Sequence, residues 1–329
     1  MRQVRKNQFV GCLLGQCLGD AIGFVREGSP TTVCKSYVED VLRPRKIDGV
    51  KWGQYSDDSQ LARELLLSYI SKGTFDQQDF ARRIVLIFSE SRVVGAGFAT
   101  PNAAGRLAKG VPLDDAGEPP PYAGNGTAMR AAPIGLIFYD RPDKLVKASH
   151  DQSRITHKDN RCSAGAIAIA GAVAQAVYSE SINIEEFCTQ LSNWTGKYDR
   201  VLANALADEM SSWTKLEPME ALVHISPVGR DFASEDRSEI SPFVTPSVLW
   251  SLYSFLRTPE SYWESICTAI TPGGDVDTTA AMTGAISGAR VGIEGIPNDW
   301  VRRVTDRGEW AYDDLVRLAT QCYEIRSKQ

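Results

Sequence analysis

The chain of 329 residues carries a net charge of −5, with 43% hydrophobic and 23% charged residues. This composition is typical of a globular protein that buries a substantial core, and it excludes a basic field for nucleic acid or for an anionic membrane surface. The seven cysteines show no C-x-x-C spacing, which favours buried free thiols over disulfides or zinc ligands. We therefore expect a cytoplasmic protein with neither nucleic acid nor membrane as a partner.

The first predicted element is a helix with glycine at every fourth position, at Gly11, Gly15, Gly19 and Gly23. This spacing leaves one face of the helix almost free of side chains, so another backbone must pack closely against it. The apolar run is too short and too polar to span a bilayer, because Gln16 and Asp20 interrupt it. Asp20, beside the stripe, is either a buried capping acid or a functional one, and Glu27 follows in a turn.

The second predicted helix runs from about Ser59 to Lys72 and has two adjacent acids, Asp57 and Asp58, at its start. Acids at this position commonly cap a helix and complement its dipole. Two adjacent acids exceed what one cap requires. The pair, with the hydroxyl group of Ser56 before it, is therefore a candidate ion site.

A glycine-rich loop near the middle of the chain, Gly124-Asn125-Gly126-Thr127, precedes an apolar helix. Free backbone N–H groups at such a helix start favour phosphate, although most turns of this kind bind nothing. His157 then precedes a helix built from alanine and glycine. A histidine in this position is either structural or part of a site.

The rest of the chain also has helical periodicity, and no convincing run of alternating strand residues occurs. Further helices are predicted over residues 77–90, 100–110, 184–194, 201–213, 246–256, 259–270 and 312–328. Two polar stretches, residues 111–121 and 226–241, are predicted to be loops. The sequence therefore predicts an all-α protein that forms a single domain over residues 1–329.

The segment 271–296 combines a glycine loop, acids at a helix start and a helix of small residues. Asp275 and Asp277 stand beside the hydroxyl group of Thr278. Glycine costs about 1 kcal/mol relative to alanine inside a helix, so this helix must regain that free energy through close backbone packing. With Asp57 and Asp58, it supplies four carboxylates, which suit magnesium, manganese or calcium and argue against zinc. If the carboxylates converge, their mutual repulsion predicts two divalent cations.

Five segments of the chain resemble the signature blocks of the ADP-ribosylglycohydrolase family, in the family's order. They are GCLLGQCLGDAIGFVRE, YSDDSQLA, GNGTAMRAAPIG, THKDNRCSAGAIAIA and GGDVDTTAAMTGAISGARVGIEGIP. The resemblance covers residues 9–296. It implies a compact, orthogonal all-α fold with a dinuclear centre, usually of magnesium or manganese, at the bottom of an ADP-ribose cleft.

Carried over position by position, the resemblance implies a set of metal ligands: Ser56, Asp57, Asp58, Asp275, Asp277 and Thr278. It makes Glu27 the leading acid–base candidate, with Asp57 and Asp58 as competitors. It also implies substrate contacts from Gly124, Asn125, Gly126, Thr127 and His157. Ser56 and Ser59 replace the family's more common threonine, but serine keeps the ligand oxygen.

The resemblance implies a hydrolase that reverses ADP-ribosylation by cleaving the glycosidic bond between ADP-ribose and an acceptor. The expected substrate is an ADP-ribosylated protein, with arginine as the preferred linkage, or a small ADP-ribose conjugate, and the expected product is ADP-ribose. Two alternatives stay open: a non-catalytic ADP-ribose-binding relative, and a phosphohydrolase that acts on the diphosphate. We expect a monomer, with the loops 91–97 and 226–241 deciding which linkage is cleaved.

Overall fold

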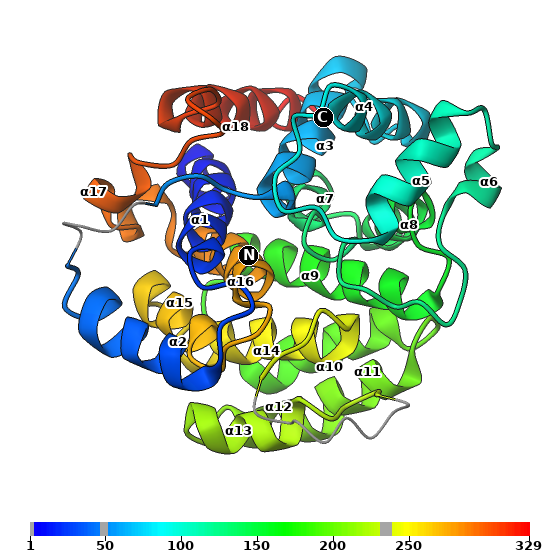
Figure 1. Cartoon of the computed structure of the whole chain (residues 1–329). Coiled ribbons are helices and arrows are strands. Elements are labelled where there is room, and N and C mark those ends of the chain that lie inside the picture. The colour runs from blue at the N-terminus through cyan, green and yellow to red at the C-terminus, as the bar shows by residue number, and fades with distance from the viewer. Residues whose placement is uncertain (1–2, 47–51, 231–238) are drawn as a thin grey trace.

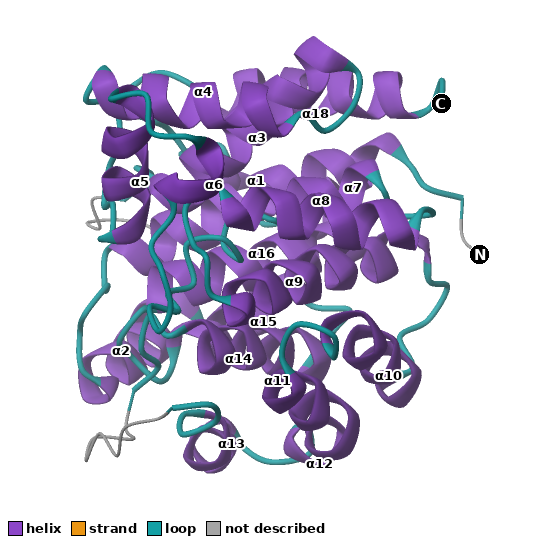
Figure 2. Ribbon diagram, turned by 90° about the vertical axis from the view of Figure 1, so that its right-hand side faces the viewer, coloured by secondary structure: helices purple, strands orange, loops and turns teal. Residues whose placement is uncertain are grey.

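Helices and connecting loops make up the parts of the chain that the computed structural model describes, residues 3–46, 52–230 and 239–329. Within these ranges no β-strand forms, as Figure 2 shows, and the predicted all-α class is confirmed. The seven cysteines are all buried and free, as the sequence predicts.

Two helices lie side by side in the middle of the molecule (Figure 1): α1 (Lys6–Phe24) and α16 (Val276–Val291). The glycine stripe of α1 packs against α16 in antiparallel register, with Gly11 on Gly288, Gly15 on Gly284 and Gly19 on Ala280. A methyl group on any of the three α1 glycines would collide with a carbonyl oxygen of α16. The predicted close packing of another backbone on the stripe is therefore observed, and α16 is the partner.

Replacing Gly19 with alanine is expected to destabilise the protein by roughly 1 to 3 kcal/mol, because the new methyl group would overpack the contact between α1 and α16. The control is Gly105→Ala in α5 (Ala99–Ala108), where a methyl group meets no atom within 4 Å. The control should stabilise by about 0.5 to 1 kcal/mol, since alanine is the better helix former. Urea unfolding measures the free energy of unfolding of the two variants. If Gly19→Ala and Gly105→Ala had equal free energies of unfolding, α1 and α16 would move apart to accommodate the methyl group without a loss of stability.

The first half of the chain surrounds α1 with shorter helices. They are α2 (Thr31–Tyr37), the π-helical turn η1 (Val38–Leu42), α3 (Asp57–Lys72), α4 (Gln77–Ser89), α5, α6 (Leu113–Ala116), α7 (Ala132–Ile137) and α8 (Pro142–Arg154). Helices α3, α4 and α5 lie where the sequence predicts helices, whereas α2 and α8 are absent from the prediction and α6 lies inside the predicted loop 111–121. Each of these three helices starts at or directly after a proline, whose fixed φ angle suits the first helical turn.

The second half of the chain packs around α9 and α16. Its helices are α9 (Asn160–Tyr178), α10 (Ile184–Thr195), α11 (Arg200–Asn204), η2 (Ala205–Glu209), α12 (Met210–Trp213), α13 (Pro218–Ile225), α14 (Val244–Arg257), α15 (Tyr262–Ile270), the 3-10 turn η3 (Ile293–Gly295), α17 (Asn298–Val301) and α18 (Tyr312–Arg326). The predicted helix 201–213 is interrupted by the π-helical turn η2, and α13 is absent from the prediction. Residues 231–238 of the predicted loop 226–241 lie outside the described residues.

The helices are layered around the central pair. Figure 2 shows α3, α4 and α18 on one side of the molecule and α12 and α13 on the opposite side, with α1, α9 and α16 between them. By length and composition α9 could cross a membrane, but 89% of its apolar stretch is buried inside the protein. The core helix of a soluble protein passes the same test, so α9 is weak evidence for a membrane span.

Candidate metal and substrate site

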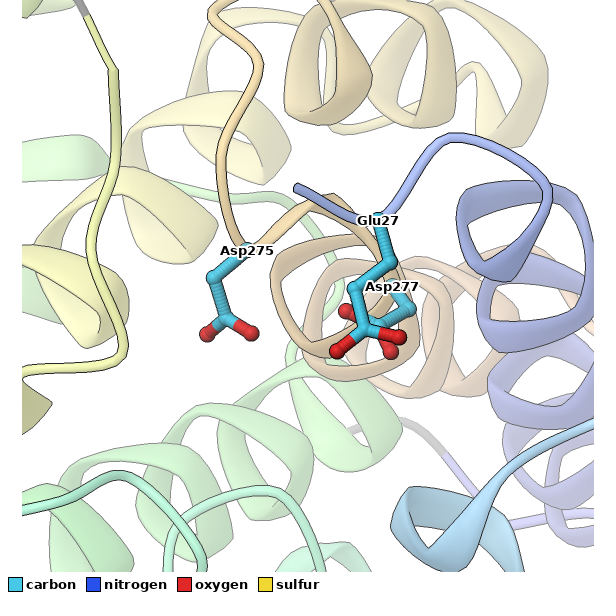
Figure 3. Close-up of side chains that lie close together, drawn as sticks. All are labelled: Glu27, Asp275 and Asp277. Carbon is cyan, nitrogen blue, oxygen red and sulfur yellow. The ribbon is translucent and has the colours of Figure 1, made fainter. Parts of the chain in front are cut away.

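Three acidic side chains from two distant parts of the chain meet at the start of α16. Glu27 follows the end of α1, and its ligand oxygen lies within 4.8 Å of those of Asp275 and Asp277 (Figure 3). Asp277 is 4% exposed and Asp275 is 9% exposed, whereas Glu27 is open to solvent. The close packing of α1 on α16 brings them together: a methyl group on Gly23 would lie 2.5 Å from the Cα atom of Asp277.

The two acids at the start of α3 line the same cavity as these three carboxylates. Asp57 is 6% exposed and Asp58 is 2% exposed. The hydroxyl oxygen of Thr278 lies 3.3 Å from Oδ1 of Asp58 and 3.2 Å from Oδ1 of Asp275, so it joins the two groups of acids. The structure therefore brings the four aspartates singled out in the sequence, together with Glu27, to one cavity.

Asp20 of α1 fixes the start of α3. Its carboxylate accepts hydrogen bonds from the backbone N–H groups of Ser56 at 2.9 Å and Ser59 at 3.1 Å. Asp20 is thus a buried capping acid, one of the two roles left open by the sequence. Ser56 is itself the N-cap of α3, with its hydroxyl oxygen 3.3 Å from the N–H donor of Asp58. Ser56 is not among the described residues that line the cavity, so its role as a metal ligand stays a prediction.

Burial and neighbouring negative charge raise the pKa of the carboxyl groups in this cluster. Burial, followed by the charge of Asp20, raises the pKa of Asp57 to about 8. Burial alone is the main cause that raises the pKa of Asp275 to about 6. For Asp58 and Asp277, burial and the surrounding aspartates hold the pKa well above its usual range. Without a cation, ionisation of these carboxyl groups therefore costs free energy.

Two buried oxygens of the cluster, Oδ2 of Asp58 and Oδ1 of Asp277, have no hydrogen-bond partner among the described residues. A buried acceptor without a partner typically costs about 1 to 3 kcal/mol. A divalent cation would satisfy such oxygens and neutralise the repulsion between the carboxylates. Carboxylate and hydroxyl oxygens are also the donors that magnesium and manganese prefer. The residues present therefore fit the two cations that the sequence predicts.

The free energy of unfolding of the cation-free protein is expected to fall as the pH rises from about 5 to about 8. The pKa values of Asp275, at about 6, and Asp57, at about 8, are raised in the folded state, which therefore binds protons more tightly than the unfolded state. This stabilisation is complete below the unfolded pKa and is lost as the pH rises through the folded values. Denaturant unfolding in EDTA measures the fall, and excess magnesium should abolish it. A stability that increases over this range in EDTA would contradict the raised pKa values.

The glycine-rich loop forms another wall of the cavity, with lining residues Gly124, Asn125 and Gly126. The side-chain amide of Asn125 donates to Oγ of Ser247 at 2.9 Å and to Oδ2 of Asp275, and its backbone N–H donates to the carbonyl oxygen of Pro242 at 3.0 Å. All three N–H donors of Asn125 are thus used inside the protein. In this arrangement the amide of Asn125 orients Asp275, and a contact between Asn125, which lines the cavity, and the substrate stays a prediction.

Thr127 follows Gly126 in the loop but is not among the described residues that line the cavity, so its contact with the substrate stays a prediction. Its side chain is buried, and its hydroxyl group donates to the carbonyl oxygen of Cys162 at 2.9 Å. In the described part of the chain, however, the backbone N–H groups of Gly126 and Thr127 have no hydrogen-bond partner. These two N–H groups keep phosphate binding by the loop as a prediction.

His157 lines the cavity next to the glycine-rich loop and is 2% exposed. Its ring lies 5.8 Å from the ring of Tyr122, measured between centroids. Burial, followed by the positive charge of Arg130, lowers the pKa of His157 to about 3. The imidazole is therefore neutral at physiological pH.

The complete chain, residues 1–329, matches the sequence model of the ADP-ribosylglycohydrolase family. The chain belongs to this family. It is 31% identical to the ADP-ribosylhydrolase ARH3 of Xenopus tropicalis, over 89% of this chain and 90% of that protein. It is 24% identical to the ADP-ribosyl-[dinitrogen reductase] glycohydrolase of Rhodospirillum rubrum, over 90% of this chain and 88% of that protein.

A solved structure described as an ADP-ribosylglycohydrolase-related protein complex has the same fold. Its TM-score is 0.74 at 25% sequence identity, and the match covers 98% of this chain and 99% of that one. The predicted membership of the ADP-ribosylglycohydrolase family, and with it the predicted class of enzyme, is confirmed.

Other residues of this ADP-ribosylglycohydrolase-family protein also reach the cavity. Gly95 and Gly97 come from the loop 91–97, which was expected to help decide the linkage. The others were not singled out in the sequence: Phe98, Ala99, Thr100, Tyr122, Met129 and Pro242. Gly95 has a φ angle of +76°, and a methyl group there would lie 3.2 Å from Cβ of Ser56. The run Val94-Gly95-Ala96-Gly97 was the signal for such a close backbone turn.

Proposed function

We propose that this protein hydrolyses the glycosidic bond between ADP-ribose and an acceptor and so reverses ADP-ribosylation. The observation that carries the proposal is the buried carboxylate cluster, whose unpartnered oxygens on Asp58 and Asp277 share a cavity with a glycine-rich loop. An enzyme that cleaves a bond at ribose must orient the sugar, assist the leaving group and supply a water molecule. Membership of the ADP-ribosylglycohydrolase family supports the same activity.

Two divalent cations, Mg²⁺ or Mn²⁺, belong to this proposal. The residues that would hold them are Ser56, Asp57, Asp58, Asp275, Asp277 and Thr278. When bound, such cations orient sugar hydroxyl groups and lower the pKa of water. Asn125 supports this role, because its amide hydrogen bond to Oδ2 of Asp275 fixes the direction of that carboxylate.

The chain's own acids supply the proton transfers. Glu27 lies at the exposed edge of the cluster beside Asp277, and partial burial raises its pKa. A carboxyl group with a raised pKa can take up and release a proton near neutral pH. Glu27 is therefore the leading acid–base residue, with Asp57 and Asp58 as competitors. The positive charge that develops on the ribose during cleavage is stabilised by the surrounding carboxylates.

Arginine-linked ADP-ribose on a protein is the substrate that we propose. A second cavity, of about 500 Å³, adjoins the first at Glu27, Asp275 and Pro242, and its lining includes Glu239. Arg230 also lines this cavity, but the three carboxylates of Glu27, Glu239 and Asp275 outnumber it and favour a cationic guanidinium group as the acceptor. The relative from Rhodospirillum rubrum is named for ADP-ribose on a protein, which supports a protein substrate here.

The test is a panel of one carrier protein with ADP-ribose linked through arginine or through serine, incubated with Mg²⁺, Mn²⁺ or EDTA. We expect intact ADP-ribose to be released, fastest from arginine and only with a cation present. Release of AMP would show the phosphohydrolase instead. Faster release from serine would overturn the choice of linkage alone, whereas no release from either linkage in Mg²⁺ or Mn²⁺ would leave a non-catalytic binder.

A further inference from the structure

We infer that Thr156 and Arg130 are positioning residues that hold His157 in one neutral tautomer, with the proton on Nε2. In this state Nε2–H is a fixed hydrogen-bond donor that faces the cavity beside the glycine-rich loop. The ligand that it fits is a phosphate oxygen of a nucleoside diphosphate. That ligand rests on the proposed function, whereas the tautomer follows from contacts inside the protein.

Arg130 starts the chain of contacts. Its side chain is fully buried, and its Nη2 donates to Oγ1 of Thr156 at 2.8 Å and to the carbonyl oxygen of Gln152 at 3.2 Å. Its Nε donates to Oε1 of Gln152 at 2.8 Å, so two residues fix the guanidinium group. A guanidinium group has donors and no acceptor, so the oxygen of Thr156 must accept from Arg130.

Because the oxygen of Thr156 accepts from Arg130, the hydroxyl hydrogen of Thr156 is left to donate to His157. Thr156 is fully buried, and its Oγ1 lies 2.8 Å from Nδ1 of His157. Among the described residues, Nδ1 is the sole acceptor within reach of the hydroxyl hydrogen. If Nδ1 carried a proton, the Thr156 oxygen would accept two hydrogen bonds and its own hydrogen would stay buried without a partner, which is unfavourable. Nδ1 is therefore the acceptor.

The other nitrogen of His157 faces the cavity. Nε2 makes no hydrogen bond within the described residues, and His157 is one of the cavity-lining residues. A methyl group built on Gly126 would lie 3.1 Å from Cε1 and 3.5 Å from Nε2 of His157, so this edge of the ring borders the loop. The ring is neutral because burial and the charge of Arg130 lower its pKa to about 3, so its single proton is on Nε2.

This donor borders Gly126, which lines the same cavity and whose backbone N–H has no hydrogen-bond partner within the described residues; the N–H of Thr127 follows it in the loop. Together they offer donors to phosphate oxygens without a formal positive charge. A positively charged imidazole at this place would instead compete with the metal cations for the carboxylates of the cavity. Fixing the neutral tautomer therefore separates phosphate binding from cation binding within one cavity.

The tautomer can be measured directly by NMR of protein labelled with ¹⁵N-histidine, because the chain has 3 histidines. His157→Asn assigns the signals. In the wild type we expect the signal of a protonated Nε2 and an unprotonated Nδ1 at residue 157. Thr156→Val keeps the shape of the side chain but removes the hydroxyl group, so it should give a mixture of tautomers. Thr156→Ser restores the hydroxyl group and should restore the wild-type spectrum.

Binding supplies the second readout, with ADP-ribose as the probe. Thr156→Val should weaken its affinity roughly five- to tenfold, the equivalent of one hydrogen bond, and Thr156→Ser should return it to the wild-type value. The control is Thr195→Val, which removes a buried hydroxyl group that donates to the carbonyl oxygen of Leu191 at 2.9 Å. This control should change neither the tautomer nor the affinity.

A protonated Nδ1 at His157 in the wild type would overturn the inference, and so would an unchanged spectrum in Thr156→Val. The wild-type spectrum decides the tautomer alone, so a failure of Thr156→Val to fold leaves the inference testable. The NMR measurement also requires no enzymatic activity. A protein that shows the Nε2–H tautomer but cleaves no linkage would therefore refute the proposed function and retain this inference.

Discussion

Replacing Asp277 with asparagine is expected to lower the rate of ADP-ribose release by more than about 100-fold while the fold survives. Loss of an outer partner of a metal ligand typically costs roughly 10- to 100-fold, so loss of a ligand should cost more. Asparagine keeps the size of the side chain, but it removes one negative charge from a group that is 4% exposed. Steady-state kinetics with the substrate that the wild type cleaves best measure the loss.

Stability separates a metal-binding role of Asp277 from a capping role. Wild type should gain about 2.7 kcal/mol when free Mg²⁺ or Mn²⁺ is about 100 times its dissociation constant, since a cation that binds only the folded state shifts unfolding by mass action. Asp277→Asn should lose most of this gain. In EDTA the variant should equal or exceed the wild type, because it removes one of several repelling carboxylates.

The matched control is Asp76→Asn, at the N-cap of α4, where the carboxylate accepts a hydrogen bond from the N–H of Asp79 at 2.8 Å. Asparagine caps a helix about as well as aspartate, so activity and the cation-induced gain should both stay at wild-type values. Thermal melts with EDTA and with excess cation compare the three proteins. An equal gain in wild type and Asp277→Asn would leave Asp277 as a helix-start residue without a metal.

Replacing Gly126 with valine is expected to weaken ADP-ribose binding by about 100-fold, the loss of two hydrogen bonds to a charged phosphate at roughly 1.5 kcal/mol each. The new side chain would press on His157, since its Cβ would lie 3.1 Å from Cε1 of that ring and 3.5 Å from Oγ1 of Thr100. It would also take up space in the cavity that Gly126 lines. Calorimetry with ADP-ribose measures the change in affinity.

The same variant should keep the cation-induced gain in stability, because the carboxylates lie in α3 and at the start of α16, and the Asn125 amide that orients Asp275 is retained. Gly105→Val is the control: it places the same side chain on α5, outside the residues that line the cavity. The control should bind ADP-ribose as the wild type does. Unchanged affinity in Gly126→Val would remove the loop from the substrate site.

The central helix pair and its acids could be predicted from local patterns. Glycine at every fourth position from Gly11 to Gly23 required a closely packed backbone, and the small residues after Asp277 required the same. Each pattern predicted that its own helix packs closely against another backbone, but neither pattern predicted that the two helices pack against each other. The structure supplies it, and the pairing explains why Glu27 and Asp277 meet although they are far apart in the chain.

The walls of the cavity could not be predicted in the same way, because loop side chains take their direction from tertiary contacts. Asn125 had the composition of a phosphate-binding loop residue, yet its donors go to Asp275, Ser247 and Pro242, which are distant in sequence. The turn at Gly95 has no periodicity from which a position could be derived. Short helices such as α2 could not be predicted, because they are too short to show a helical period.

We propose that the carboxylates of α3 and of the start of α16, with Glu27 beside them, form a centre for two divalent cations. The most direct measurement is an anomalous difference map from crystals of the wild-type protein grown with Mn²⁺. We predict two manganese peaks in the cavity, in contact with Oδ2 of Asp58 and Oδ1 of Asp277, the buried oxygens that lack a partner within the described residues. A cavity without manganese peaks at saturating Mn²⁺, or peaks confined to the protein surface, would contradict the claim.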